Sequence, residues 1–429
     1  MKLVVKGARI VSPSEIAEND ILIENGLIKK IAKDIKDPSA KTLDARGKYA
    51  LPGFIDMHTH LRTPGREDEE TIETGSRAAV KGGFTTILCM PNTEPAIDNY
   101  EIALRIRKEA EKIGLLDIFP VGAITKQRQG KELSEFGQLK KAGCLALSDD
   151  GSPVEDPSLL RKALEYAKLF DLLIISHCED LSLSGGGILR ESELTAKSGF
   201  SYIPEIAESV IVAREIELAR FLEAKIHLAH ISTNRSIELI KRAKKDAIRV
   251  SAESCPHYFS LSLEDIAKNF DSNYKVNPPI GTKEDRQAIC KALASDIIDC
   301  IATDHAPHTF LEKEGTFYEA AFGMIGLETA FALSLRLVKE RIINLEKLAD
   351  KLSYAPSRIL GLSDRGLIEE GRRADIAIVD LDKTWTLTEE KISSKSKNTP
   401  FLNQAFEGCV EYTLYKGKIV YKYTDDHIR

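Results

Sequence analysis

The sequence predicts an α/β protein, a (β/α)8 barrel of the TIM type with a small β-sandwich domain built from the N- and C-terminal segments. Two observations predict the barrel: eight short apolar runs end in polar residues, and stretches with helical spacing of apolar residues lie between them. A third observation predicts the sandwich: both ends of the chain contain segments with the residue pattern of β-strands. The pattern leaves open a doubly wound open sheet.

The N-terminal segment is expected to form strands joined by a hairpin. Residues 2–11 and 21–35 are strand-like, and Asn25-Gly26 falls between two apolar runs of the second stretch. Asn-Gly is a preferred pair in two-residue hairpin turns, because both residues tolerate a positive φ. We therefore expect the chain to reverse direction at residues 25 and 26.

At Gly53 the sequence pattern changes to short apolar runs that alternate with stretches of helical periodicity. The runs that we interpret as barrel strands are residues 53–60, 85–92, 117–125, 144–151, 172–180, 225–232, 248–257 and 299–308. The stretches that we interpret as helices include residues 99–114, 158–171, 207–224 and 235–246. Strand character returns at residues 373–382 and 409–423. We therefore assign residues 53–359 to the barrel, and residues 1–52 and 360–429 to one composite β domain.

Composition argues against several classes of function. The chain has 429 residues, 43% of them hydrophobic, and a formal net charge of -6 without a long basic tract. We therefore expect no nucleic-acid or membrane partner. No run approaches the ~18 apolar residues of a membrane span, and the start does not resemble a secretory signal, so we expect a cytoplasmic protein. The seven cysteines form no C-x-x-C pair, which leaves histidine and carboxylate as candidate metal ligands.

Polar residues at the ends of the predicted strands indicate a site. Catalytic residues of such barrels lie at the C-terminal strand ends. The residues that fall there are His58, His60, His177, His230, His305, His308, Asp150 and Asp304. A single histidine at a strand end is more often a hydrogen-bonded structural residue than a ligand. Four such histidines with two aspartates on the same face favour a metal site.

Strand parity narrows this set, because successive side chains point to opposite faces. His58 and His60 share a face and can bind one ion. His227 and His230 have opposite parity, so we expect only one of them to point inward. His230 is at the strand end and is the better candidate, and we interpret His227 as structural.

The same rule divides the remaining candidates. The side chains of Asp304 and His305 point to opposite faces of the strand, so only one of them can point into the barrel mouth. We choose Asp304, because His308 on the loop that follows can join it in a site. We expect a structural role for His257, in "CPHYF". The thiol of Cys178 is expected to lie in the core, because parity turns it away from the site.

The donor set determines the expected metal. Imidazole and carboxylate without thiolate suit zinc or a similar divalent ion in an open catalytic site. Four histidines and two aspartates are too many for one tetrahedral ion, but they suit two ions ~3.5–4 Å apart, bridged by a carboxylate and a hydroxide. Zinc lowers the pKa of bound water to about 7, so the hydroxide would form near neutral pH. The pattern therefore predicts metal-assisted hydrolysis.

These residues resemble a known family. H-x-H at the first barrel strand, a carboxylate at the fourth, histidines at the fifth and sixth and an aspartate at the eighth are similar to the amidohydrolase superfamily. Within it, the chain resembles the class I dihydroorotases from about Leu51 to "GLIEEGRRADIAIVD". The segments that carry this resemblance are "HTHLRTPG", "MPNT", "LSDDG", "SHCED", "LAHIS", "VNPPIG", "TDHAPH" and "FGMIGLET".

The resemblance implies two zinc ions per subunit. The ligands of the more buried ion would be His58, His60 and Asp304, and those of the more exposed ion His177 and His230. Asp150 would bridge the two ions together with the hydroxide. Many relatives use a carboxylated lysine as the bridge, and "CLALSDDG" has none. Asp149 is the competing candidate, but the family spacing to the next ligand favours Asp150.

The resemblance also implies a substrate site. Dihydroorotate carries a carboxylate, and a guanidinium offers two parallel donors to such a group. Arg62 would bind it with help from Asn92. The implied substrate-binding residues are His60, Leu61, Arg62, Asn92, Asn277, His308, Phe322 and Gly323. From the residues alone, a loop salt bridge for Arg62 and a turn for Asn92 are equally good interpretations.

The implied activity is the reversible closure of N-carbamoyl-L-aspartate to L-dihydroorotate with loss of water, the third step of pyrimidine synthesis in the family. In the hydrolytic direction the bridging hydroxide would attack the ring amide carbonyl. Asp304 would take the proton and deliver it to the departing nitrogen, first as a general base and then as a general acid.

Two alternatives remain at this point. An allantoinase or hydantoinase would also keep H-x-H, but neither ring carries the carboxylate for Arg62 and Asn92, and both usually keep the lysine bridge. An inactive scaffold for aspartate transcarbamoylase would typically lose metal ligands, which this chain retains. The resemblance leaves open an active complex with aspartate transcarbamoylase, a homodimer, and a mobile lid after His308.

Overall fold

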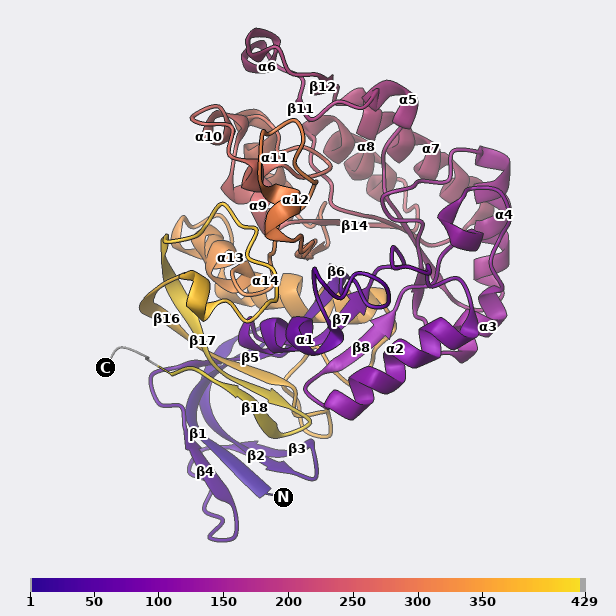
Figure 1. Ribbon diagram of the computed structural model, residues 1–429. Coiled ribbons are helices and arrows are strands. Elements are labelled where there is room, and N and C mark those ends of the chain that lie inside the picture. The colour runs from indigo at the N-terminus through magenta and orange to yellow at the C-terminus, as the bar shows by residue number, and fades with distance from the viewer. Residues whose placement is uncertain (1, 425–429) are drawn as a thin grey trace.

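The computed structural model describes residues 2–424 and contains a closed barrel beside a sheet formed by both ends of the chain (Figure 1). The terminal sheet has the strand order β18-β17-β16-β5-β1-β2-β3, with β4 beside β1. Its strands are β1 (Lys2–Val11), β2 (Ile16–Glu24), β3 (Leu27–Ala32), β4 (Lys41–Asp44), β5 (Tyr49–Pro52), β16 (Ile376–Thr386), β17 (Ala405–Tyr415) and β18 (Lys418–Lys422). The antiparallel pair β5 and β16 joins the two ends of the chain.

The expected hairpin is confirmed. Glu24 of β2 pairs with Leu27 of β3, and the two residues between them have φ values of 52° at Asn25 and 83° at Gly26. Two consecutive positive φ values match the right-handed twist of the flanking strands. The Asn-Gly pair therefore sets the register of this edge of the terminal sheet.

Eight parallel strands form the barrel. They are β6 (Phe54–Thr59), β7 (Phe84–Cys89), β8 (Asp117–Pro120), β9 (Ala146–Leu147), β10 (Leu173–Ser176), β13 (Ile226–Leu228), β14 (Val250–Ser254) and β15 (Cys300–Ile301). Six parallel ladders join neighbours in this order. Two bridges close the circle, Gly122 with Leu147 beside β9 and Thr59 of β6 with His305. The closed barrel, rather than an open doubly wound sheet, is therefore the fold.

Helices cover the outside of the barrel (Figure 1). The four stretches interpreted as helices from the sequence are confirmed as α2 (Tyr100–Ile113), α4 (Pro157–Lys168), α7 (Ile206–Leu222) and α8 (Asn234–Lys245). The other longer helices are α1 (Ile72–Lys81), α3 (Phe136–Lys141), α6 (Glu193–Ser198), α11 (Lys283–Ala294) and α13 (Ala330–Lys339). Shorter elements are α5 (Leu181–Ser184), α9 (Pro256–Ser260), α10 (Leu263–Ile266), α12 (Phe310–Lys313), α14 (Leu345–Ala349), α15 (Ala355–Ile359), β11 (Leu189–Arg190) and β12 (Tyr202–Ile203).

Local sequence sets the ends of these helices. At the start of α2, the side chain of Asn99 accepts a hydrogen bond from the backbone N–H of Ile102. At its end, Gly114 adopts a φ of 70°, which costs glycine little and stops the helix. The chain thus leaves each helix at a defined residue and returns to the barrel.

Apolar packing fills the barrel beneath its mouth. Ile55 and Met57 of β6 lie in one buried cluster with Leu88 of β7 and the following Met90. Burying each such side chain stabilises the fold by roughly 1.5–3 kcal/mol. The predicted metal ligands lie at or just beyond the C-terminal strand ends, so this core supports the site from below.

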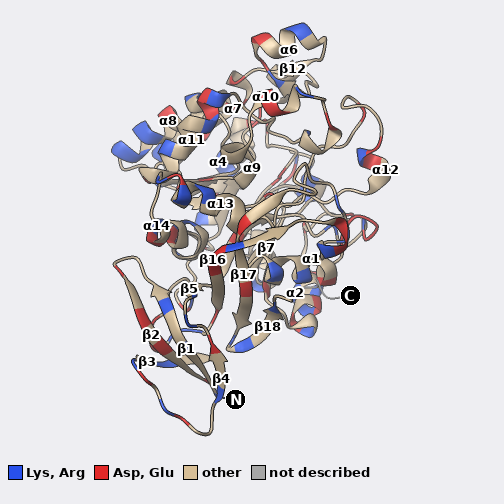
Figure 2. Ribbon diagram, turned by 90° about the vertical axis from the view of Figure 1, so that its left-hand side faces the viewer, with Lys and Arg blue, Asp and Glu red and all other residues tan. Residues whose placement is uncertain are grey.

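The outer surface carries both signs of charge. Figure 2 shows Lys and Arg as well as Asp and Glu on the outer helices and on the terminal sheet. Within residues 2–424, no helix combines the length and the apolar character that crossing a membrane requires.

Candidate metal centre and substrate cavity

The strand ends bring the six predicted metal ligands together. Two groups of three residues have ligand atoms within 4.8 Å of one another, and they share Asp150: one adds His58 and His60, the other His177 and His230. Asp304 approaches the first group, because its Oδ1 lies 3.0 Å from His60 Nε2 and 3.6 Å from His58 Nε2. All six residues are buried. The arrangement offers two adjoining sets of donors around one shared carboxylate.

Asp150 occupies the centre of this cluster. Its oxygens lie 3.3 Å from His58 Nε2, 3.4 Å from His177 Nδ1, and 3.7 Å from both His60 Nε2 and His230 Nε2. Asp149 points elsewhere, because one of its oxygens accepts the backbone N–H groups of Ile124 (2.8 Å) and Thr125 (3.1 Å). Of the two candidates for a bridge, Asp150 is the one that faces the histidines.

Hydrogen bonds fix the orientation of three histidines. Each gives one ring N–H to a neighbour outside the cluster: His58 Nδ1 to Glu253 (2.9 Å), His60 Nδ1 to Asn92 (2.8 Å) and His177 Nε2 to Glu179 (3.0 Å). Such bonds orient each ring, and in the neutral tautomer that they favour the other ring nitrogen is unprotonated and can bind a metal. The Nε2 of His58 is buried without a hydrogen-bond partner among the described residues, which fits a ligand position.

Electrostatics keep both aspartates ionised. Burial alone raises the pKa of Asp150, but His58, His177 and His230 outweigh it and hold that pKa well below its usual value. Burial likewise opposes ionisation of Asp304, yet its histidine neighbours leave its pKa below the usual value. Carboxylates in their charged form are the state that binds metal.

Three residues at the mouth of the barrel have a positive φ, a backbone conformation that residues other than glycine seldom adopt. Arg62, His230 and Asp304 have φ values of 57°, 35° and 48°. A non-glycine residue in the left-handed region costs of order 1–3 kcal/mol, and such residues concentrate at functional sites. Here the turns aim side chains just beyond the strand ends into the mouth of the barrel.

A cavity of about 260 Å³ adjoins the cluster. It is lined by His60, Arg62, Asn92, Asp150, Gly151, His177, His230, Asn277, Asp304, Ala306, His308, Phe322 and Gly323. All the predicted substrate-binding residues except Leu61 are in this set. Leu61 is fully buried and lies against Gly75 of α1, so its side chain faces the core.

Arg62 makes an ion pair and lines the cavity at the same time. Its Nε lies 2.8 Å from Glu69 Oε2 and donates to the carbonyl of Pro307 (3.1 Å), while its Nη2 lies 3.2 Å from His308 Nε2. The loop salt bridge considered from the sequence is therefore present. It fixes the guanidinium at the cavity wall, where this mostly buried cation can receive an anionic group of a ligand.

Asn92 and Asn277 each use one end of the side-chain amide within the protein, which leaves the other end available to a ligand. The side-chain oxygen of Asn92 accepts from His60, which leaves its NH2 group as a donor toward the cavity. The NH2 group of Asn277 donates to Glu179 (2.7 Å), which leaves its oxygen as an acceptor. The cavity thus presents a donor beside Arg62 and an acceptor on another wall.

Two glutamates that hold the site residues in place were not predicted from the sequence. Glu179 links His177 to Asn277, and Glu253 links His58 to a structural histidine. Glu179 stands two residues after His177 in "SHCED", which is a signal that could have found it.

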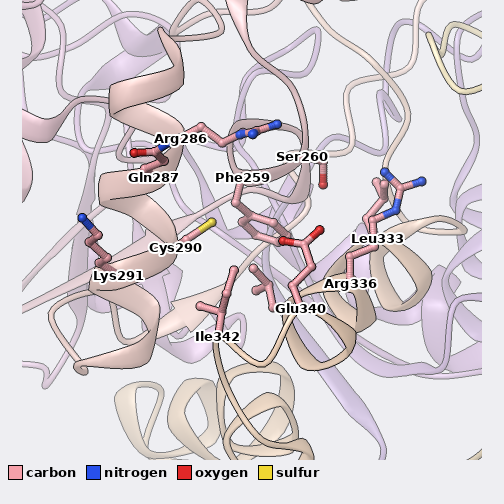
Figure 3. Close-up of a pocket in the computed structure, with 11 residues that line it drawn as sticks. Phe259, Ser260, Arg286, Gln287, Cys290, Lys291, Leu333, Arg336, Glu340 and Ile342 are labelled. Atoms are coloured by element: carbon pink, nitrogen blue, oxygen red, sulfur yellow. The ribbon is translucent and has the colours of Figure 1, made fainter.

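A larger cavity, of about 470 Å³, lies on the outside of the barrel between α9, α11 and α13 (Figure 3). Figure 3 shows Cys290 and Arg286 of α11 on one side, Arg336 of α13 on the other, and Phe259 between them. None of its lining residues is a histidine or a predicted site residue. The metal-type cluster belongs to the smaller cavity in the barrel mouth.

The barrel and its histidine and carboxylate cluster define an amidohydrolase. The family model described as "Amidohydrolase family" matches residues 49–420, and the chain belongs to this family.

Curated relatives identify the branch. Proteins named dihydroorotase are 46% identical in Geobacter metallireducens, over 98% of this chain and 100% of the relative, and 46% identical in Trichlorobacter lovleyi, over 98% and 99%. The dihydroorotase of Acetivibrio thermocellus is 45% identical over 97% of this chain and 98% of the relative. Within the amidohydrolases, the chain therefore belongs to the dihydroorotases, and the resemblance found in the sequence is confirmed.

Solved structures show the same fold. The L-hydantoinase (dihydropyrimidinase) from Arthrobacter aurescens superimposes with a TM-score of 0.88 at 25% identity, covering 98% of this chain and 96% of that protein. The dihydropyrimidinase from Brevibacillus agri gives a TM-score of 0.85 at 23% identity, covering 98% and 95%. Their lower identity places the hydantoinases further from this chain than the dihydroorotases are.

Proposed function

We propose that this protein is a metal-dependent dihydroorotase, which interconverts N-carbamoyl-L-aspartate and L-dihydroorotate with loss or uptake of water in pyrimidine synthesis. One observation carries the proposal: the histidine and aspartate cluster shares a cavity with the mostly buried guanidinium of Arg62. The cluster suits hydrolysis of a cyclic amide, and the guanidinium suits a substrate that bears a carboxylate. The full-length dihydroorotase relatives support it.

The proposed cofactors are two zinc ions. His58, His60 and Asp304 would hold one, His177 and His230 would hold the other, and Asp150 would contact both. Imidazole and carboxylate donors, fixed tautomers and the unpartnered Nε2 of His58 fit this assignment. When bound, the ions would polarise the ring amide carbonyl and lower the pKa of the attacking water.

The cavity residues would orient the substrate. Arg62 would pair with the carboxylate, and the free NH2 group of Asn92 would donate to the same group. The oxygen of Asn277 would accept a ring N–H. Backbone groups of Leu61, Phe322 and Gly323, with the side chain of His308, would complete the wall around the carboxylate and ring.

Asp304 would carry the proton. As the water oxygen forms a bond to the ring carbonyl carbon, the Asp304 carboxylate accepts the water proton. As the bond from that carbon to the ring nitrogen breaks, Asp304 returns the proton to the nitrogen and the ring opens to N-carbamoyl-L-aspartate. In the synthetic direction the same residue acts in the reverse order.

An assay with three rings tests the proposal. Zinc-loaded protein should hydrolyse L-dihydroorotate with a kcat/KM at least about 100-fold above those for hydantoin and allantoin, because neither of these has a carboxylate for Arg62. Comparable or greater efficiency on hydantoin or allantoin would refute the assignment. EDTA treatment should abolish the activity, and added zinc should restore it.

Further parts of the assignment come from the sequence and the family. We propose that the terminal sheet forms a β-sandwich domain of residues 1–52 and 360–429 beside a barrel of residues 53–359. We also propose a cytoplasmic protein with a small-molecule substrate and without a nucleic-acid or membrane partner. A homodimer and a complex with aspartate transcarbamoylase stay predictions, to be checked by the mass of the purified protein alone and with that enzyme.

A further inference from the structure

A segment from the C-terminal part of the chain supports one wall of the cavity through hydrogen bonds. Residues 393–399, here called the strap, are the middle part of the connection between β16 and β17, which leaves the terminal sheet for the mouth of the barrel. Figure 1 shows this yellow segment passing close to α13 and α1. Its backbone N–H groups at Ser393 and Ser394 donate to Glu328, just before α13. The strap is thus held on the barrel at its first residues.

The strap next binds the loop that precedes α1. Ser394 Oγ and the backbone N–H of Lys395 donate to the carboxylate of Glu70, and Ser396 Oγ donates to the carbonyl of Glu69 (2.6 Å). Glu69 is the residue whose carboxylate pairs with Arg62 (2.8 Å). The strap therefore holds the backbone that presents the anionic partner of Arg62.

Asn398 makes the most extensive contacts. Its Oδ1 accepts the backbone N–H of His308 (3.1 Å), and its Nδ2 donates to the carbonyls of Ala306 (3.0 Å) and Gly323 (3.1 Å). Its own carbonyl accepts the N–H of Ile325 (2.9 Å). The residue is only 5% exposed. One buried side chain thus joins the loop after β15 to the loop that ends at residue 325.

These two loops form the wall that faces Arg62. Ala306, His308 and Gly323 all line the cavity, and His308 Nε2 lies 2.8 Å from the carbonyl of Phe322. The loops are in close contact: a Cβ at Gly323 would come within 2.8 Å of the Ala306 side chain. Because the two loops are packed this closely, the hydrogen bonds of Asn398 determine the positions of His308 and Gly323.

We infer that Asn398 is a positioning residue that sets the affinity for the substrate carboxylate by fixing this wall, an inference that rests on the proposed function. Asn398 does not line the cavity, so it acts through His308 and Gly323. Lys313 Nζ also donates to the Gly323 carbonyl (3.1 Å), so loss of Asn398 loosens the wall without releasing it. We therefore expect a moderate effect on binding and little effect on the metal ligands.

The substitution Asn398→Asp tests the inference. It preserves the shape and the Oδ1 acceptor but replaces the donating NH2 group with an oxygen that faces two carbonyls. We expect a KM for dihydroorotate about tenfold higher, with kcat within threefold and zinc content unchanged. The dissociation constant of orotate, a planar analogue with the same carboxylate, should rise by a similar factor in calorimetry.

The matched control is Asn344→Asp. Asn344 is exposed and uses only its Oδ1, which accepts the N–H of Lys347 at the start of α14 (2.9 Å). Aspartate caps a helix equally well, so KM, kcat and orotate affinity should stay at wild-type values. If Asn398→Asp does not fold, Asn398→Ala, which removes the same bonds without adding charge, gives the deciding measurement with the same expected shift.

The outcomes separate the two proposals. A folded, zinc-loaded Asn398 variant with wild-type KM and orotate affinity would overturn the inference, and so would a fall in kcat alone, since that indicates a smaller active fraction. If the wild-type protein neither turns over dihydroorotate nor binds orotate, the proposed function fails and the inference falls with it.

Discussion

Replacing Arg62 with methionine should convert a carboxylate-selective site into one that ignores the carboxylate. The side chain of Arg62 is 11% exposed, and its guanidinium is held at the cavity wall by Glu69. Removing one member of a buried, hydrogen-bonded charge pair costs about 2–5 kcal/mol. Glu69 already offsets part of the charge, so the lower part of this range applies, about 2–3.5 kcal/mol.

At 1.4 kcal/mol per tenfold, this cost corresponds to a kcat/KM for dihydroorotate that is roughly 30- to 300-fold lower. Most of the loss should appear in KM, because the carboxylate is bound equally before and during the reaction. Steady-state kinetics on zinc-loaded protein measure both constants. A substrate ring without a carboxylate, such as hydantoin, should show no comparable loss.

Arg66→Met is the matched control. Arg66 also pairs with Glu69 (3.2 Å), and with Asp68 and Glu312, but it does not line the cavity. The Arg66→Met substitution therefore removes a cation from Glu69 but leaves the guanidinium of Arg62 in place. The kcat/KM for dihydroorotate should stay within about threefold of the wild-type value. An Arg62→Met enzyme with unchanged KM and kcat, or an equal loss in both variants, would refute the reasoning.

Three further predictions concern the metals and the fold. Asp150→Ala should reduce the zinc content from two ions to one or none per chain, because both donor sets share this carboxylate; unchanged content by elemental analysis would contradict the bridge. Glu253→Gln should lower zinc affinity about 10- to 100-fold, since glutamine cannot accept from both histidine partners; equal affinities in chelator competition would argue otherwise. Asp117→Asn should lower the free energy of unfolding of the metal-free protein by about 3 kcal/mol at pH 7, because Arg365 and Arg373 lose a shared carboxylate. The pKa of Asp117 is lowered, its arginine partners outweighing burial, so this stabilisation is present above about pH 4 and is lost as the pH falls further. Denaturant titrations at pH 7 and pH 3 should show the two proteins converging, and a difference that grows at pH 3 would be inconsistent with the ion pairs.

The sequence could predict the barrel because each strand is a separate apolar run that ends in polar residues. The four helices and the Asn25-Gly26 turn were likewise predicted, since their signals are local: periodicity, capping residues and a turn pair. The cluster around Asp150 could be anticipated because C-terminal strand ends of a barrel meet at one mouth.

The alternation of side-chain directions along a strand predicted less about residues at or beyond the strand ends. β13 stops at Leu228, so His230 lies on a loop, and its φ of 35° rather than strand alternation turns it into the cluster. His227 was expected to be structural, and it contacts Glu253 (3.1 Å), which in turn binds His58. Both histidines therefore belong to one network, although the alternation rule allowed only one of them to point inward.

Long-range packing was beyond the sequence. Asn398 lies 90 residues after His308, within the segment assigned to the β domain, yet it holds the wall of the cavity. Nothing in "SSKSKNTP" by itself indicates a partner in the barrel. Such contacts depend on the packing of whole elements and become visible only in three dimensions.

The most direct test of the account is a crystal structure of the zinc-loaded protein with N-carbamoyl-L-aspartate, with anomalous data collected at the zinc edge. The account predicts two anomalous peaks on either side of Asp150, one beside His58 and one beside His177, with a substrate carboxylate on Arg62. A single peak outside this cluster, or a ligand whose carboxylates avoid Arg62, would contradict it.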